Sequence, residues 1–303
     1  MTNTAMKKTM SAKTNAIIYK VVCYTLLVLF AVILIFPYAF MISKSLMSPE
    51  EAISPKTVLL PASPQWGNYA EILKDSGYGK AFLHTFEVIV FNSIAVPLSA
   101  TFVAFGFARF KFVGKNFLFM FMLSTMMLPA VVTQISLYVL YSKINWLNTL
   151  LPLTIPNITG GGAIYIFLAR SFVQSLPKDI DDAAKIDGAG PIRRYAAITL
   201  PLLKPVLIYI VINVFNSAWG DYYGPLIWKL DENFPDTLAY KVFYLITSGA
   251  VGNDKTNIRM AAGVIMSIVP AVLFFIFQKQ LIEGVAMDGL KGRLNEIYNR
   301  GKL

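Results

Sequence analysis

Long apolar runs alternate with short polar segments along this chain of 303 residues. Each run is about 20 residues or longer and carries few charges, which is what an α-helix needs to cross the hydrocarbon core of a bilayer. We therefore predict six transmembrane helices, at residues 17–42, 85–107, 117–140, 149–172, 205–228 and 259–282. The predicted fold class is an all-α integral membrane protein, with a polar tail at 1–16 and one transmembrane domain over 17–303.

The distribution of positive charge predicts the topology. The net charge is +10, and 18 of the 27 Lys and Arg residues fall in the N-terminal segment through Lys20, in the loop at 108–116, in the loop from Arg170 to Lys204 and in the C-terminal segment from Lys279. The positive-inside rule places these segments in the cytoplasm. A nucleic-acid-binding protein would gather its basic residues in a patch with stacking aromatics. We therefore expect a lipid bilayer, and no nucleic acid, as a partner.

Single-residue counts and missing motifs argue against catalysis by this chain. Cys23 is the only cysteine and His84 the only histidine, so an intramolecular disulfide and metal sites built from several Cys or His residues are excluded. No G-x-x-x-x-G-K-[ST] segment occurs, so the chain does not bind ATP through that motif. We expect a non-enzymatic chain that binds no metal or cofactor. The first apolar run is too long for a signal peptide and lacks a cleavage signal, so we expect it to stay in the mature protein.

A charged loop over residues 175–204 interrupts the apolar second half of the chain. Pro177 suits the first turn of a helix, and the three aspartates that follow suit its positive end. Gly188 is a typical residue for the C-terminal stop. We therefore predict a short helix over about 177–187.

One face of this predicted helix is suited to docking against another surface. Helical spacing brings together Leu176, Ile180, Ala183, Ala184 and Asp187. The two alanines at the centre let another surface approach the helix backbone closely. The alternative is an ordinary loop helix that happens to carry two alanines. A second short helix begins at Gly190-Pro191 and carries Arg193 and Arg194.

The pattern of this loop resembles that of a known family. Four short segments at fixed spacing resemble the "EAA" loop of ATP-binding-cassette importer permeases. They are Asp182-Ala183-Ala184, Asp187-Gly188-Ala189, Ile198 and Leu200-Pro201. The closing Leu-Pro-Leu-Leu-Lys-Pro segment is similar to that of carbohydrate permeases of the maltose-transporter type. Asp182 stands where the family usually has Glu, which keeps the charge and shortens the reach by one methylene. The resemblance extends to Asn68-Tyr69 and to the C-terminal pairs Phe277-Gln278, Glu283-Gly284 and Lys291-Gly292.

The resemblance implies a permease subunit with the six-span importer fold and a cytoplasmic coupling helix. Such a subunit pairs with a second, homologous permease subunit, two ATPase subunits that hold ATP and Mg, and an extracytoplasmic substrate-binding protein. It lies in the plasma (inner) membrane of a prokaryote, with both termini in the cytoplasm, and imports a sugar or oligosaccharide. The residues that the resemblance assigns to ATPase coupling are Asp182, Ala183, Ala184, Asp187, Gly188, Arg193 and Arg194.

A polar strip in the fifth apolar run is the candidate substrate path. Helical spacing places Asn213, Asn216, Gly220 and Asp221 on one face, with Trp219, Tyr222 and Tyr223 beside them. Amides and carboxylates bind sugar hydroxyls, and aromatic rings stack on sugar faces. The alternative is a set of hydrogen bonds between helices. The family has an Asn where Gly220 stands, which weakens this comparison.

Two other classes of protein, and two readings of the outer loop, stay open. Asp221 is the only ionisable residue clearly inside a span, so an ion-coupled secondary carrier is the main alternative. A membrane scaffold is another, and the charged loop argues against both. The polar loop at 229–258 either is a passive connection or reaches into the binding protein. Three glycines at 160–162 either allow close packing or a local break, or line the transport path.

Overall fold

The computed structural model of the chain is helical throughout the residues that it describes. It describes the backbone of residues 2–54, 58–74, 76–247 and 255–300, and the side chains of 16–54, 58–74, 77–129, 131–247 and 255–278. The described chain divides into two compact units, residues 1–74 with 248–265, and residues 75–247 with 266–303. The predicted positions in the C-terminal tail from Glu283, and 248–254 of the outer loop, lie outside the described side chains.

The first unit contains α1 (Thr2–Ser45), α2 (Pro49–Ile53), α3 (Gly67–Lys74) and the first turns of α15 (Thr256–Arg300). The apolar part of α1, from Ala16 to Ser45, buries none of its most apolar stretch inside the chain. Asn68 ties the unit together, because its Nδ2 donates to the carbonyls of Ser45 (2.8 Å) and Met47 (3.0 Å). Its Oδ1 accepts a hydrogen bond of 3.0 Å from Asn257 of α15.

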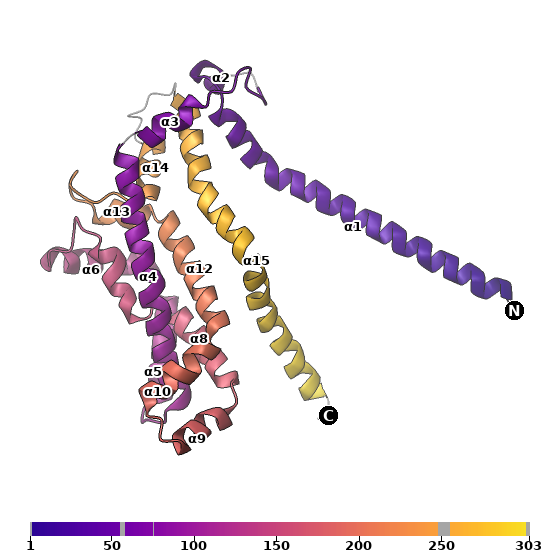
Figure 1. Cartoon of the computed structure of the whole chain (residues 1–303), viewed down its shortest axis with the longest axis vertical. Helices are drawn as coiled ribbons and strands as arrows, with labels where there is room; N and C mark the ends of the chain where they lie inside the picture. The colour runs from indigo at the N-terminus through magenta and orange to yellow at the C-terminus, as the bar shows by residue number, and fades with distance from the viewer. Residues whose placement is uncertain (1, 55–57, 75, 248–254, 301–303) are drawn as a thin grey trace. The chain divides into compact units, whose positions relative to one another are not determined.

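The second unit is built around the long helix α4 (Ser76–Arg109), which packs along α8 (Ala163–Ser175) and α12 (Lys204–Gly220) (Figure 1). Small residues allow this close approach, since Ala100 and Ala104 of α4 and Ala169 of α8 are fully buried. Without a hydrophobic drive between helices in lipid, such close van der Waals packing is a main source of association. Larger side chains such as Ile210 complete the core.

Two of the predicted spans are broken. The third predicted span becomes α5 (Lys115–Ser124), η1 (Thr125–Met127) and α6 (Ala130–Lys143), and the two parts differ in direction by 100°. Pro129 stands at the break in an extended conformation (φ −61°, ψ 131°), since a proline cannot donate the hydrogen bond that would continue the helix. The third predicted span is therefore two separate helices and not one continuous helix.

The fifth predicted span, which we expected to continue to Trp228, ends as a helix at Gly220. Asp221 takes an extended conformation (φ −75°, ψ 98°), and a separate helix, α13 (Tyr223–Trp228), follows. The Oδ1 atom of Asp221 accepts the backbone N–H of Gly224 at 2.8 Å, so the carboxylate stabilises the start of α13. The prediction that Asp221 continues the helical face of Asn213 and Asn216 is therefore wrong.

The three glycines at 160–162 form a tight turn between two short helices and α8. They follow α7 (Leu151–Thr154) and η2 (Ile155–Thr159), and all three have positive φ, at 103°, 61° and 128°. A Cβ atom on Gly161 would lie 2.4 Å from a methyl group of Val96, so the turn approaches α4 as closely as its backbone allows. The glycines therefore provide a local break and a close contact, and Gly161 also lines the cavity described below.

The remaining helices lie at the two ends of this unit. α9 (Lys178–Ile186), α10 (Pro191–Arg194), the π-helical turn η3 (Tyr195–Thr199) and α11 (Leu200–Leu202) form the predicted charged loop. In Figure 1, α9 and α10 lie at the opposite end of the unit from α13 and α14 (Leu238–Thr247). Among the residues that the structure describes, four helices are long and apolar enough to cross a membrane, or up to six if each bent pair counts as one span. The predicted all-helical membrane fold is confirmed.

Candidate functional site

The charged loop forms a short helix whose C-terminal end is fixed by hydrogen bonds. The backbone N–H of Gly188 donates to Lys185 O at 3.0 Å, and that of Ala189 donates to Ala184 O at 2.9 Å. This pair of bonds is the Schellman motif, which requires a left-handed residue after the helix. Gly188 supplies it, with φ at +76°. The predicted stop at Gly188 is therefore confirmed, whereas Pro177 lies one residue before the first turn.

An ion pair inside the loop joins α9 to α10. Arg194 Nη1 lies 2.9 Å from Asp181 Oδ2, and the two side chains are only 7% and 10% exposed. The guanidinium also lies over the ring of Phe110, 5.9 Å from its centroid. Because Arg194 is buried and paired within its own chain, any role that it has in coupling is exerted through Asp181 and α9. Asp181 was not among the predicted site residues, and the only sequence signal for this pair is that three aspartates precede two arginines in the same loop.

The solvent-exposed surface of α9 and of the turn after it contains fewer of the predicted coupling residues than expected. Five of the predicted coupling residues are exposed, namely Asp182, Ala183, Asp187, Gly188 and Arg193. Ala184 is 6% exposed and packs against its own chain, so the prediction that both alanines form one open docking face is wrong. We define these five exposed residues as the α9 surface.

Asp182 keeps its negative charge on the α9 surface. Lys185 Nζ lies 2.7 Å from Asp182 Oδ1. This hydrogen bond, together with the positive charge of Lys185, holds the pKa of Asp182 below its ordinary value. The carboxylate is therefore ionised at neutral pH. Because both side chains of the pair are exposed, a partner protein can still reach the Asp182 carboxylate.

Two further contacts connect the charged loop to α4. Arg109, the last residue of α4, donates from Nη2 to Leu176 O at 3.2 Å, just before α9. The hydroxyl of Tyr195, in η3, donates to Leu98 O at 3.1 Å and lies 2.9 Å from the hydroxyl of Thr101. Since Tyr195 follows Arg194 directly, the ion pair and these hydrogen bonds form a continuous link from α9 to the central helix.

The predicted substrate-path residues do not form one strip. Asn213 Nδ2 donates to Tyr209 O of its own helix at 2.9 Å. Trp219 is 6% exposed and donates from Nε1 to Met266 O at 2.8 Å. Tyr222 stacks on Phe243 with ring centroids 4.5 Å apart. Asn216 is exposed, and of these five residues only Asp221 lines the cavity described next.

That cavity has a volume of about 300 Å³ and lies inside the second unit. Segments far apart in the sequence form its walls, namely α4, the turn through η2 to α8, and the end of α12 with the residues after it. Its polar lining comes from Asn92, Asn157, Tyr165, Ser217, Asp221 and Thr237. Asn92 and Asn157 were missed by sequence analysis, because each is a single amide in an otherwise apolar helix.

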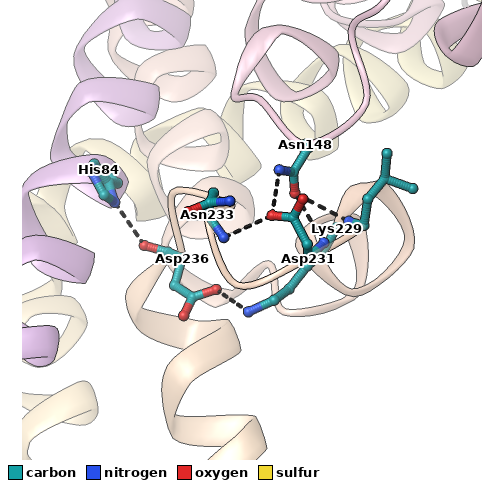
Figure 2. A network of polar contacts seen from close by, with 7 residues as sticks. His84, Asn148, Lys229, Asp231, Asn233 and Asp236 are labelled. Carbon is teal, nitrogen blue, oxygen red and sulfur yellow. Dashed lines mark hydrogen bonds and ion pairs between the residues drawn. The ribbon is translucent and has the colours of Figure 1, made fainter.

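At the other end of the unit, hydrogen bonds hold the first part of the 229–258 loop. Figure 2 shows Asn148 next to Asp231: Asn148 Nδ2 donates to Asp231 Oδ1 at 2.8 Å, and Asn148 Oδ1 accepts the backbone N–H of Asp231 at 3.3 Å. Asp231 Oδ1 also accepts the backbone N–H of Asn233 at 2.8 Å. This bond from Asn233, with the amide of Asn148, lowers the pKa of Asp231.

The same loop is anchored to α4. His84 Nδ1 lies 3.0 Å from the carbonyl oxygen of Asp236, and Lys229 Nζ donates to the carboxylate of Asp236 at 2.9 Å (Figure 2). Leu238 N, at the start of α14, donates to Thr85 Oγ1 at 2.8 Å. The first nine residues of the loop are therefore a fixed surface, and the one histidine of the chain helps to hold it.

The comparisons with known proteins identify the protein family to which this chain belongs. Residues 95–286 match the family described as "Binding-protein-dependent transport system inner membrane component". This match covers more than half of the chain, and the chain belongs to this family. The predicted resemblance to importer permeases is confirmed: the chain is a permease subunit of a binding-protein-dependent ABC importer, a multi-pass inner-membrane protein without a catalytic domain of its own.

Individual relatives cover nearly the whole chain. "Galactooligosaccharides transport system permease protein GanQ" of Bacillus subtilis (strain 168) is 30% identical over 274 residues, which are 89% of this chain and 94% of that protein. "Maltodextrin transport system permease protein MdxG" of the same strain is 28% identical over 286 residues, 93% of this chain and 100% of that protein. A chain of a bacterial ABC transporter involved in the import of the acidic polysaccharide alginate has the same fold, with a TM-score of 0.74, 21% identity and coverage of 86% and 96%.

Proposed function

We propose that this permease subunit imports a sugar or oligosaccharide. The observation that carries the proposal is the match over most of the chain to relatives whose names state galactooligosaccharide and maltodextrin transport. A third relative, from Halalkalibacterium halodurans, is named for arabinooligosaccharides and is 29% identical over 266 residues, 93% of that protein. Neutral oligosaccharides are the substrate class that these names share.

The partners follow from the family and from what this chain lacks. The subunit pairs with a second, homologous permease subunit and receives its substrate from an extracytoplasmic binding protein. Two ATPase subunits bind ATP and Mg and supply the energy. Both termini and α9 lie in the cytoplasm, where those ATPase subunits are, and the anchored loop from Lys229 lies outside.

Coupling takes place at the α9 surface. The small side chain of Ala183 and the bare backbone of Gly188 allow an ATPase subunit to approach closely, while Asp182, Asp187 and Arg193 offer charged contacts. Closure of the ATPase dimer on ATP moves α9 as a rigid body, because the Asp181–Arg194 pair holds it to α10. The Tyr195 hydrogen bonds then pass this displacement to α4. ATP can drive transport only if it binds the complex with different affinities in the inward-facing and outward-facing states of the permease.

Site-directed crosslinking tests the coupling surface. In a Cys23→Ser background, Ala183→Cys should crosslink to an ATPase subunit of the assembled complex through a short bifunctional maleimide, and ATP should change the yield. The matched control is Asn233→Cys, which is also exposed but lies in the anchored outer loop. A crosslink at position 233, or none at position 183 in a complex that hydrolyses ATP, would contradict the assignment.

Uptake assays test the substrate and the energy source. Proteoliposomes that contain the assembled complex should take up a radiolabelled galacto-, malto- or arabino-oligosaccharide only with ATP inside and binding protein outside. Ionophores should leave this uptake unchanged. Ionophore-sensitive uptake without ATP would instead support an ion-coupled carrier that uses Asp221.

The outer loop has a separate test. A passive connection would tolerate deletion of part of 245–254, whereas a segment that reaches into the binding protein would not. We expect the deletion to lower uptake while the ATPase subunits still assemble with the permease. Unchanged uptake by the deletion variant would rule out a role in binding-protein contact.

A further inference from the structure

The cavity of the second unit is large enough to hold one ring of a sugar. Its volume of about 300 Å³ is at the lower end of the range of ligand pockets, about 300–1,000 Å³. It adjoins the middle of α4 and the end of α12, so it is inside the transmembrane bundle of this one subunit. In such a place water is scarce, and polar groups need partners.

Several polar atoms at this cavity have no partner within the described chain. Both polar atoms of the Asn92 amide have a partner, since Nδ2 donates to Leu153 O (3.0 Å) and Oδ1 accepts from Asn157 Nδ2 (3.2 Å). These bonds fix the amide of Asn157, whose Oδ1 has no hydrogen bond to the described residues. The hydroxyls of Tyr165 and Ser217 likewise have none there.

The charge of the cavity selects the chemical class of the ligand. Asp221 lines the wall, and among the described residues no Lys or Arg lies within ion-pair distance of it. An anion would be repelled. A metal ion would need several oxygen ligands of high charge density, whereas the described residues contain no group of three or more His, Cys, Asp or Glu. A neutral ligand with many hydroxyl groups can form hydrogen bonds with the carboxylate of Asp221, the amide oxygen of Asn157 and the two hydroxyls.

One wall of the cavity is aromatic. Trp228 lines it and is held in place by Tyr141, with ring centroids 5.1 Å apart at an angle of 72°, and by Tyr138. A fixed indole beside hydrogen-bonding groups suits a molecule that has both hydroxyls and an apolar ring face, and it loses little conformational entropy on binding. We propose that this cavity is a subsite of this subunit for one neutral sugar ring of the transported oligosaccharide, a statement that rests on the proposed function.

Protection of an introduced cysteine tests the subsite directly. Ser217 lines the cavity and is exposed at its edge, so Ser217→Cys in the Cys23→Ser background places one thiol at the mouth. The probe is the oligosaccharide that the assembled complex imports in the uptake assay, added to the complex in nanodiscs. We expect labelling by a small methanethiosulfonate to slow about tenfold at about ten times the Kd of the sugar. Ser124→Cys, an exposed position at the end of α5, is the control and should show no protection.

Side-chain variants then show which groups bind. Asp221→Asn keeps the shape and an acceptor for Gly224 N–H, and it should weaken protection about tenfold because a charged acceptor is lost. Tyr165→Phe should weaken it less. Ser99→Ala is the matched control, because Ser99 already bonds to Ala95 O of its own helix at 2.6 Å and does not line the cavity.

The outcomes separate this proposal from the proposed function. Uptake of a sugar that does not protect Ser217→Cys overturns the subsite and leaves the import function intact. Protection by NaCl or KCl at matched concentration, rather than by the sugar, identifies a cation site and also overturns it. If the complex imports no oligosaccharide, both proposals fall. Sugar-specific protection that Asp221→Asn weakens, and Ser99→Ala does not, supports the subsite.

Discussion

Gly188 shows how one residue determines the end of α9. Its φ of +76° is costly for any residue with a Cβ, while a Cβ there would meet open space. The effect of a substitution is therefore one of backbone conformation. Gly188→Ala should destabilise the turn by about 1 kcal/mol, and Gly188→Asn by less, since Asn tolerates the left-handed region. Substrate-stimulated ATP hydrolysis by the assembled complex should fall in the same order.

A bulky residue at the same position tests the docking surface in addition to the turn, with Gly188→Ala as the control for the backbone strain alone. Gly188→Trp should abolish coupled ATP hydrolysis while the protein still inserts into the membrane, because the indole would block the approach of an ATPase subunit. Membrane fractionation checks insertion. Normal substrate-stimulated hydrolysis by this variant would show that Gly188 is not at the contact.

Gly161 offers a second test at the level of one residue, with a partner that can be changed. Gly161→Ala should destabilise the protein, because its Cβ would lie 2.4 Å from Val96 and its φ of +61° is unfavourable for alanine. Adding Val96→Ala removes the clash but not the backbone strain, so the double variant should recover part of the loss. Thermal unfolding in detergent measures both. If the double variant unfolds at a lower temperature than Gly161→Ala alone, the loss of stability does not come from a clash with Val96.

At the level of elements, we expect the buried ion pair between α9 and α10 to make the two helices move together. Removing one partner leaves an uncompensated buried charge, and Asp181→Asn or Arg194→Gln should each destabilise the subunit by about 3 kcal/mol or more. The double variant should lose less than the sum of the two. Glu71→Gln, which breaks the exposed pair of Glu71 with Lys255 (2.9 Å), is the control and should cost about 1 kcal/mol or less.

A functional measurement distinguishes a link from a merely structural contact. If the pair transmits motion, the single variants that still assemble should hydrolyse more ATP for each sugar imported than the parent complex does. Additive effects on stability, with an unchanged ratio of hydrolysis to uptake, would show that α9 moves independently of α10.

The sequence predicted elements better than contacts. The apolar runs predicted the helices, because about 20 apolar residues have few structural alternatives in a membrane protein. The burial of Asp181, Ala184 and Arg194 could not be predicted from the sequence. Helical spacing places residues on one face of a helix, but only the packing of the next helix decides which face is covered. Asp221 shows the same limit, since nothing in the apolar pattern indicates that the helix ends at Gly220.

At the scale of the whole molecule, the distribution of charge and the two ends of the second unit predict one orientation. α9, with its charged surface, lies at the opposite end of that unit from α13 and α14 (Figure 1). The loop from Arg170 to Lys204, which contains α9, and the segment 108–116 together hold nine of the 27 basic residues, and the positive-inside rule predicts that this end faces the cytoplasm. The anchored loop from Lys229 to Asp236 then faces outward, where a binding protein would dock.

Two single-cysteine variants measure this orientation. In the Cys23→Ser background, Asn233→Cys should react with a membrane-impermeant maleimide in intact right-side-out vesicles, because Asn233 is exposed in the outer loop. Ser175→Cys, exposed at the end of α8 just before α9, should react only after the vesicles are permeabilised or inverted. The two sites are matched in exposure and differ only in the end of the unit at which they lie. Labelling of both from one side would refute the six-span topology, and the reverse pattern would place α9 outside, where no ATP could drive it.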